Sequence, residues 1–261
     1  MQLAANLSWM YPDLDWARRF EAAARDGFAA VEILLPYDEP ADWYAQRLRA
    51  NGLELALLNT PVSPGTGKLG LAAIPGAEDE FRRCLARARS VAQATGCRRI
   101  HVMAGYVAGL DRSACSAVLL SNLGLALELA ARDDLVLTLE ALNRTDMPGY
   151  FYHLPAQAIE IARHFDSPHL RVQFDFFHCD RESLDLQEEV RAAAPWIGHV
   201  QIAGAPGRHE PDLSQSGLLE AVAALPGLGY DSWIGCEYRP LTTAAKGLSW
   251  CEPLRRRGVL R

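Results

Sequence analysis

The sequence has no cysteines spaced as in a C-x-x-C motif. A zinc site built from cysteine needs closely spaced thiolate ligands, so this pattern argues against one. Isolated cysteines in a chain of 261 residues are typical of reduced thiols. We therefore expect a cytoplasmic protein without a disulfide framework. The six cysteines are Cys84, Cys97, Cys115, Cys179, Cys236 and Cys251.

Long hydrophobic segments are also missing. No uninterrupted stretch approaches the roughly 18–20 apolar residues of a membrane-spanning helix. The N-terminal MQLAANLSWMYPDLDW has neither the basic n-region nor the apolar h-region of a signal peptide. The sequence predicts neither a membrane partner nor a secretory leader.

Basic residues are fewer than acidic residues. The chain has 26 lysines and arginines against 32 aspartates and glutamates, a formal net charge of -6. Nucleic-acid binding depends on Lys and Arg side chains that neutralise phosphates, so nucleic acid is a disfavoured partner. The 49% of hydrophobic and 22% of charged residues are typical of a folded protein with a sizeable core.

A glycine-rich G-x-G-x-x-G loop would mark a doubly wound nucleotide-binding sheet, but the first expected strand ends AANLSWM. What the sequence has instead is an alternation of short apolar runs and longer amphipathic stretches. Runs such as LELALLN and DLVLTLE are typical of buried parallel strands. The expected strands are Gln2–Ser8, Ala30–Leu35, Leu53–Asn59, Arg99–Ala104, Leu135–Glu140, Arg171–Asp175, His199–Ala203 and Ser232–Glu237.

The segments between these strands have helical periodicity. Trp16, Phe20 and Ala24 recur every four residues, and Pro155 is suited to the first turn of a helix. Eight strand–helix units in a chain close to the roughly 250 residues of one barrel predict an α/β fold, a single-domain (β/α)8 TIM barrel over residues 1–261. Further helices are expected from Ala41 to Asn51, at Glu78–Thr95, Arg112–Arg132, Leu184–Ala194 and Gln215–Ala224, and beyond Pro240.

Polar residues mark the ends of four consecutive expected strands: Glu140, Asp175, Gln201 and Glu237. The active site of a TIM barrel lies at the carboxyl ends of its strands. Three carboxylates and one amide oxygen there predict a hard-cation site, with Mg²⁺ or Mn²⁺ as the occupant. For any one position, the alternative is a strand-end charge that points into solvent.

Several residues near these ends are candidates for binding a small substrate. His178 could bind a substrate hydroxyl or be an ordinary loop histidine, and Arg208 could hold a substrate carboxylate or form a surface salt bridge. Lys68 and Asn59 follow the third strand and could reach an anionic substrate. Glu32, inside the second strand, is predicted to line the barrel interior.

Three long motifs carry a resemblance to a known family. LEALNRTDMPGYF (Leu139–Phe151), VQFDFFH and HVQIAGAPGRHEP resemble the hydroxypyruvate isomerase family of the xylose isomerase-like TIM barrels, and the resemblance covers essentially the whole chain. It implies that Glu140 and Glu237 are the acid/base pair as well as metal ligands. It also implies that Asp175 and Gln201 complete the metal site.

Three loops depart from the family's pattern. Arg144-Thr145 has the order of the two residues reversed, Asp212–Gln215 replaces a glycine-rich segment that carries an acidic residue, and Lys68 stands where the family usually has Arg. All three loops are expected to face the substrate. The metal and proton-transfer residues are therefore expected to be retained, while the substrate stays open.

The resemblance implies conversion of hydroxypyruvate to tartronate semialdehyde without an organic cofactor. One glutamate would remove a proton from the hydroxyl-bearing carbon, the metal would stabilise the enediolate, and the other glutamate would return a proton to the neighbouring carbon. The alternatives are a 2-oxo-tetronate or sugar isomerase or epimerase, an endonuclease IV-like phosphodiesterase, and a non-catalytic barrel that only binds a small ligand. The sequence leaves the oligomeric state open, a homo-oligomer included.

Overall fold

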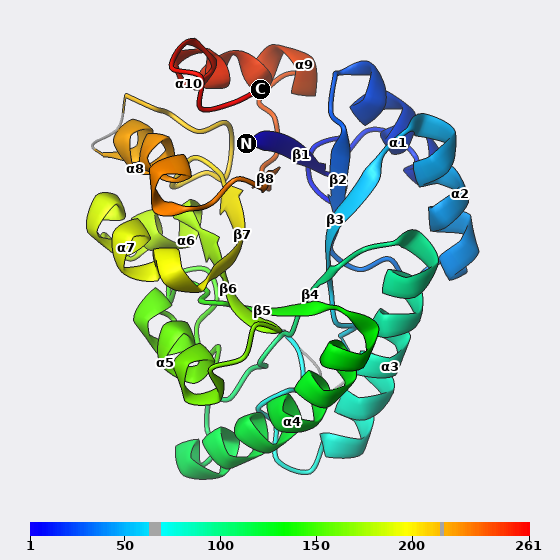
Figure 1. The fold of residues 1–261 in the computed structure, drawn as a ribbon, viewed down its shortest axis with the longest axis vertical. Coiled ribbons are helices and arrows are strands. Elements are labelled where there is room, and N and C mark those ends of the chain that lie inside the picture. Colours follow the sequence, from blue (N-terminus) through cyan, green and yellow to red (C-terminus); the bar gives the residue numbers. More distant parts are fainter. Residues whose placement is uncertain (63–68, 215–216) are drawn as a thin grey trace.

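Eight parallel strands close into a barrel in which each strand pairs with the next and β8 pairs with β1 (Figure 1). This computed structural model describes residues 1–62, 69–214 and 217–261. Lys68 and Gln215, both named in the sequence predictions, lie outside the described residues. The predicted (β/α)8 barrel is confirmed. Its strands are β1 (Gln2–Asn6), β2 (Ala30–Ile33), β3 (Glu54–Asn59), β4 (Arg99–His101), β5 (Val136–Glu140), β6 (Leu170–Asp175), β7 (Ile197–Ile202) and β8 (Trp233–Cys236).

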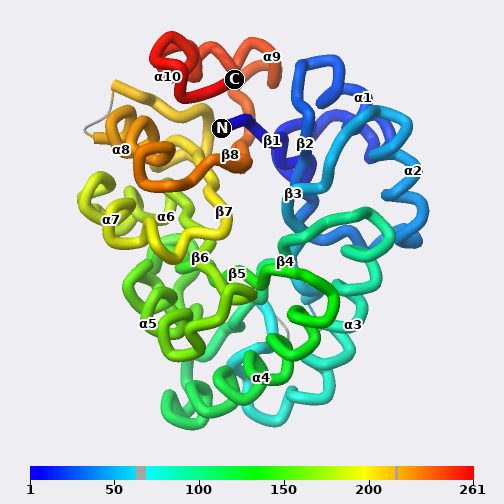
Figure 2. The backbone as a smooth tube through the Cα atoms, in the orientation of Figure 1, coloured from blue at the N-terminus to red at the C-terminus, as the bar shows by residue number. Residues whose placement is uncertain are grey.

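Helices surround this barrel in chain order, and Figure 2 shows the backbone returning so that the two ends of the chain lie near each other. They are α1 (Trp16–Arg25), α2 (Ala41–Asn51), α3 (Glu78–Thr95), α4 (Arg112–Asp133), α5 (Pro155–Phe165), α6 (Phe176–Arg181), α7 (Leu186–Ala193), α8 (Leu218–Ala224), α9 (Ala244–Gly247) and α10 (Glu252–Arg256).

Local sequence signals explain where several helices begin and end. Asp15 and Asp111 cap α1 and α4, because each side chain accepts a hydrogen bond from a first-turn backbone N–H. Gly52 and Gly96 end α2 and α3 in the left-handed conformation, which glycine adopts without steric cost.

The helix α6 was not predicted. It begins directly after β6, and Asp175 at the end of that strand accepts a hydrogen bond of 2.9 Å from the backbone N–H of Phe177. His178 therefore lies on a short helix, which corrects the expectation of a loop position. The helix has six residues and follows the strand without a break. Such a short segment does not show helical periodicity in the sequence.

The long helix α4 is apolar along much of its length. By length and composition alone it could cross a membrane, because its alanines and leucines outnumber its polar residues. In the barrel it lies against α3 and β5 as one of the outer helices. Its buried Asn122 donates a hydrogen bond of 2.9 Å to the carbonyl oxygen of Ala72.

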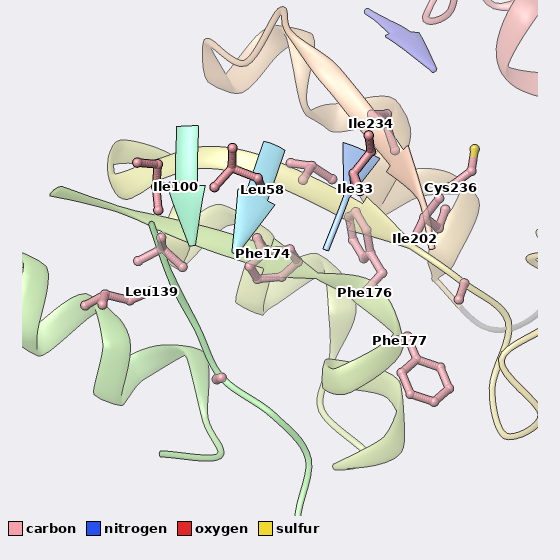
Figure 3. Close-up of a cluster of buried hydrophobic side chains, with 14 of the residues drawn as sticks. Ile33, Leu58, Ile100, Leu139, Phe174, Phe176, Phe177, Ile202, Ile234 and Cys236 are labelled. Atoms are coloured by element: carbon pink, nitrogen blue, oxygen red, sulfur yellow. The ribbon is translucent and has the colours of Figure 1, made fainter. Parts of the chain in front are cut away.

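Successive side chains along the strands point alternately to the surrounding helices and to the barrel interior. Residues such as Ile100, Leu139 and Phe174 share one apolar cluster with the surrounding helices (Figure 3). The alternate positions face the barrel interior. At the amino-terminal end that interior holds a small apolar cluster of Ala4, Ala30 and Ala56, with Trp233 against it. Toward the carboxyl end it becomes polar, and the candidate site begins there.

Candidate active site

The four strand-end residues predicted to bind a cation all lie buried at the carboxyl end of the barrel. Glu140 ends β5, Asp175 ends β6, Gln201 lies in β7, and Glu237 follows β8 directly. None of the four is more than 6% exposed. Strand register aligns Asp175 with Gln201, so the carboxylate and the amide start from neighbouring positions.

Two shared donors link these four residues in two pairs. The Nη2 atom of Arg208 lies 3.3 Å from Asp175 Oδ2 and 3.0 Å from Glu237 Oε1. The Nε2 atom of Gln173 donates to Glu140 Oε2 at 2.9 Å and to Gln201 Oε1 at 2.6 Å. The structure thus brings the predicted residues together, with Arg208 among them.

Burial and mutual repulsion disfavour the charged forms of these carboxyls. Burial, followed by the charges of Glu237 and Asp175, raises the pKa of Glu140 well above its usual value. Burial raises the pKa of Glu237 from 4.5 to about 8, although Arg208 opposes the shift. Burial also raises the pKa of Asp175. The guanidinium of Arg208 therefore does not fully offset the burial and mutual repulsion of the three carboxyl groups.

This arrangement fits a divalent cation. Glu140 Oε1 is buried without a hydrogen-bond partner, and the four predicted ligands all offer oxygen atoms, which hard cations prefer. Among the described histidines, cysteines and carboxylates, Glu140, Asp175 and His178 offer atoms that lie within 4.8 Å of one another, a group that includes His178 and not Glu237.

The hydrogen bonds of His178 argue against its binding a cation. Its Nδ1 accepts from the backbone N–H of Asn143 at 3.1 Å, which places the ring proton of the neutral imidazole on Nε2. That Nε2 lies 3.7 Å from both Glu140 Oε1 and Asp175 Oδ2. Burial, then the charge of Arg208, lowers the pKa of His178 well below 6.5. The side chain therefore presents a neutral N–H donor, suited to a substrate oxygen.

Arg208 is held by aromatic rings as well as by carboxylates. Its guanidinium carbon lies 5.1 Å from the ring centre of Trp9 and 4.6 Å from that of Phe177. Its Nε donates to the carbonyl oxygen of Glu237 at 3.1 Å. With 11% of its side chain exposed and two buried carboxylates as partners, Arg208 does not form the surface salt bridge considered as the alternative.

A cavity of about 240 Å³ opens above these residues. Glu140, Glu237, His178 and Arg208 line it, together with an apolar wall that includes Trp9, Leu34, Leu35, Met103 and Leu142. Tyr11, two residues after Trp9, donates a hydrogen bond of 3.2 Å to Asp26 and lines a separate groove.

Asn59 and His101 occupy neighbouring positions of this cavity. They are register partners at the ends of β3 and β4, and both line the cavity. Asn59 Oδ1 and both ring nitrogens of His101 are buried without a hydrogen-bond partner. His101 Nδ1 lies 3.3 Å from Glu140 Oε2, and burial lowers the pKa of the imidazole from 6.5 to about 3, which keeps it neutral.

The loops that depart from the family's pattern have partners of their own. Arg144 pairs with Glu182 at 2.8 Å through its guanidinium, and its backbone N–H donates to the same side chain at 2.5 Å. Asp212 accepts hydrogen bonds from the backbone and hydroxyl of Ser214. Of the third departure, Lys68 lies outside the described residues.

Sequence reasoning missed the polar residues below the strand ends. Thr138, Gln173 and His199 each lie two positions before one of the predicted residues, and all are buried. Because strand side chains alternate, position i–2 shares the interior face with position i. That spacing would have identified them, but these strands resemble continuous apolar runs. His101 had no such spacing to identify it, because no predicted site residue lies in the short strand β4.

The raised pKa of Glu237 predicts how metal-free stability varies with pH. Its carboxyl loses a proton at about 8 when folded but at about 4.5 when exposed, so the folded state loses stability as pH rises through this window, by up to about 1.4 kcal/mol per pH unit. With EDTA present, we expect Glu237→Gln to unfold at a higher temperature than the wild type at pH 8. The difference should shrink toward pH 5. A difference that does not depend on pH would contradict this.

Comparison with known proteins agrees with the geometry. A sequence model of the xylose isomerase-like TIM barrel family matches residues 20–254. The chain belongs to the xylose isomerase-like TIM barrel family. Among its relatives, the 2-oxo-tetronate isomerase of Cupriavidus necator is 43% identical over 254 residues, covering 97% of this chain and 98% of that one. The hydroxypyruvate isomerase of Escherichia coli is 34% identical over 257 residues, covering 98% and 100%.

Solved structures with the same barrel fold include one of similar sequence and others of distant sequence. The crystal structure titled AP endonuclease, family 2, from Brucella melitensis has a TM-score of 0.91 at 36% identity and covers 97% of this chain and 98% of that chain. D-psicose 3-epimerase from Clostridium cellulolyticum has a TM-score of 0.76 at 17% identity and covers 90% and 84%, a likeness in fold alone. The predicted resemblance to the hydroxypyruvate isomerases is confirmed.

Proposed function

We propose that this protein is a divalent-cation-dependent isomerase of a small α-hydroxy oxo-acid, with hydroxypyruvate and its four-carbon homologue 2-oxo-tetronate as the candidate substrates. The observation that carries the proposal is the convergence of three buried carboxyls and one amide oxygen at the barrel mouth, joined through Arg208 and Gln173. Relatives named for these two isomerase activities support the same chemistry.

In the proposed reaction, Glu140 and Glu237 move the proton between adjacent carbons. One takes it from the hydroxyl-bearing carbon, which leaves an enediolate, and the other delivers a proton to the former carbonyl carbon. The hydroxyl proton passes to the former carbonyl oxygen, so hydroxypyruvate becomes tartronate semialdehyde. Their raised pKa values suit both carboxyls to binding a proton near neutral pH.

The other residues bind and orient the substrate. His178 donates its Nε2–H to a substrate oxygen, and Arg208 pairs with the substrate carboxylate. Glu140, Asp175, Gln201 and Glu237 would hold Mg²⁺ or Mn²⁺. When bound, that cation supplies polarisation of the carbonyl and charge to balance the enediolate.

Incubation of Mn²⁺-loaded protein with hydroxypyruvate in D₂O tests the proposal. Deuterium should appear at a carbon next to the carbonyl, detected by NMR, and should not appear when EDTA is present. Exchange that persists without any metal would contradict cation dependence. Absence of exchange with hydroxypyruvate, 2-oxo-tetronate and a panel of sugars would leave the non-catalytic barrel as the better function.

A four-carbon substrate is the second candidate, favoured by Asn59 and His101. 2-Oxo-tetronate equals hydroxypyruvate with one additional hydroxymethyl group, and the cavity presents the unpartnered polar atoms of Asn59 and His101 to a ligand. A hydroxyl bonded there would satisfy buried groups that otherwise cost free energy.

Replacement of His101 by leucine should therefore affect the two substrates differently. We expect kcat/KM for 2-oxo-tetronate to fall by up to about tenfold more than that for hydroxypyruvate, the worth of one hydrogen bond. The ratio of the two kcat/KM values is the measurement. An equal loss for both substrates would show that His101 does not bind the additional hydroxyl.

The endonuclease-like alternative has less support in the site. Such an enzyme needs several histidine ligands and a basic groove for phosphates. Within the described residues, the group that could hold a metal contains one histidine, His178. The ring proton of His178 is on Nε2, the nitrogen that faces the carboxylates. The net charge of -6 also opposes a polyanionic substrate.

A further inference from the structure

Glu32 of β2 lies completely buried at the centre of a hydrogen-bonded network below the carboxylates. Asn6 Nδ2 and Gln201 Nε2 each donate to its Oε2 at 2.9 Å, and His199 Nε2 contacts its Oε1. Glu32 Oε2 thus acts as an acceptor toward both amides, and an amide donates only through its nitrogen. Gln201 must therefore turn its amide nitrogen toward Glu32, which leaves its Oε1 on the side of the candidate cation site.

The orientation passes to a second amide. Because Gln201 presents its oxygen, Gln173 must present its nitrogen, and Gln173 Nε2 donates to both Gln201 Oε1 at 2.6 Å and Glu140 Oε2 at 2.9 Å. The Oε1 of Gln173 accepts from Thr138 Oγ1 at 3.0 Å, which agrees with the same orientation. Two amides that could each adopt either of two orientations are thereby fixed in one.

The barrel has space for Glu32 because position 235 in β8 is glycine. A Cβ atom added to Gly235 would lie 1.9 Å from Glu32 Oε1, closer than any real contact. An alanine there would displace the carboxylate from Asn6, Gln201 and His199. The network therefore depends on four strands, with Asn6 from β1, Glu32 from β2, His199 and Gln201 from β7, and the gap from β8.

We propose that Glu32 is a positioning residue, an acceptor-only carboxylate that directs the Gln201 oxygen to the cation and the Gln173 amide nitrogen to Glu140. This inference rests on the proposed function, because it concerns how the cation is held. If Gln201 turned over, its NH₂ group would face the cation and repel it. Outer partners that orient ligands typically contribute 10–100-fold to metal affinity.

The substitution Glu32→Gln tests this role with nearly the same volume. A carboxamide at position 32 can donate to Gln201 Oε1 and so lets the amide of Gln201 turn over. We expect the affinity for Mn²⁺, measured by isothermal titration calorimetry, to fall about 10–100-fold. Glu54→Gln is the matched control, because Glu54 is an exposed carboxylate at the opposite end of β3, and its affinity should equal that of the wild type.

The exchange of side chains in Glu32→Gln/Gln201→Glu separates orientation from a general need for a carboxylate at position 32. The carboxamide at position 32 can donate to the carboxylate at position 201, whose second oxygen then faces the cation, and the total charge equals that of the wild type. We expect Mn²⁺ affinity to return to within about tenfold of the wild type, since the orienting contribution is restored.

Each outcome decides the inference. Equal affinities of wild type and Glu32→Gln would overturn it, as would a double variant that folds, by circular dichroism, but binds Mn²⁺ no better than Glu32→Gln. If Glu32→Gln does not fold, recovery in the double variant alone supports the inference, and failure of that variant to fold or bind overturns it. A wild type that binds no Mn²⁺ overturns the proposed cation site itself, and this result is distinct from the others.

Discussion

Replacing Glu140 or Glu237 by glutamine is expected to slow proton exchange between substrate and solvent by about 10²–10⁴-fold. Each change keeps the shape of the side chain and one oxygen but removes the group that takes up the proton. Both carboxyls are buried at the mouth, and burial raises the pKa of each. Both substitutions also remove charge that would hold the cation, so the effect should lie toward the upper part of this range.

Deuterium incorporation into substrate, followed by NMR under saturating Mn²⁺, measures this effect. Glu54→Gln serves as the control here too, since it removes a carboxyl exposed at the far end of the barrel. Circular dichroism should show that every variant remains folded. If either glutamine variant exchanges within about tenfold of the wild type, that residue is not an acid or base of the reaction.

Arg208→Ala is expected to weaken both substrate binding and the metal-free fold. A charge-assisted bond to a carboxylate contributes about 1.5–3 kcal/mol, so the Michaelis constant should rise roughly 10–100-fold. Loss of the guanidinium also leaves Asp175 and Glu237 buried without their 3.3 and 3.0 Å partner. Removing one partner of a buried ion pair costs about 3–5 kcal/mol. Because Arg208 touches Glu237, a lower kcat should accompany the change.

Urea unfolding at pH 8, with EDTA or with saturating Mn²⁺, separates the two effects. The loss of stability should be largest in EDTA and smaller with Mn²⁺, since a cation would balance the same carboxylates. Arg239→Ala, which removes an exposed charge nearby, is the matched control and should leave both measurements unchanged. A Michaelis constant that stays the same for every oxo-acid would show that Arg208 does not hold the substrate carboxylate.

Most of the fold could be predicted from the sequence because its signals are local. The alternation of apolar runs with stretches such as Trp16–Ala24 specifies strand and helix by their different periods, and eight such units leave few topologies besides a closed barrel. The ends of elements were harder to place. The eighth strand ends at Cys236 rather than Glu237, and Gln215, the predicted start of the helix before it, lies outside the described residues.

The site could be predicted only in part, because its residues differ in how they are positioned. Glu140 and Asp175 end their strands, and barrel topology alone puts such residues on one face. Arg208 reaches Asp175 from the segment after β7, whose path the sequence pattern does not give. The contact of His199 with Glu32 joins residues 167 positions apart, which depends on how the barrel closes and on the register of its strands.

That register limits the ways in which such a site can diversify. Asn59 and His101 are strand partners, as are Asp175 and Gln201, so the side chains around the mouth belong to fixed positions of a closed ring. Where the ladder is regular, one residue inserted within a strand would turn the following side chains to the opposite face. The barrel absorbs an additional residue beside Glu32 and beside Gln173, where the register shifts. We therefore expect new specificities in this architecture to arise through replacements at strand positions such as His101, or through changes of length in the loops beyond the strand ends.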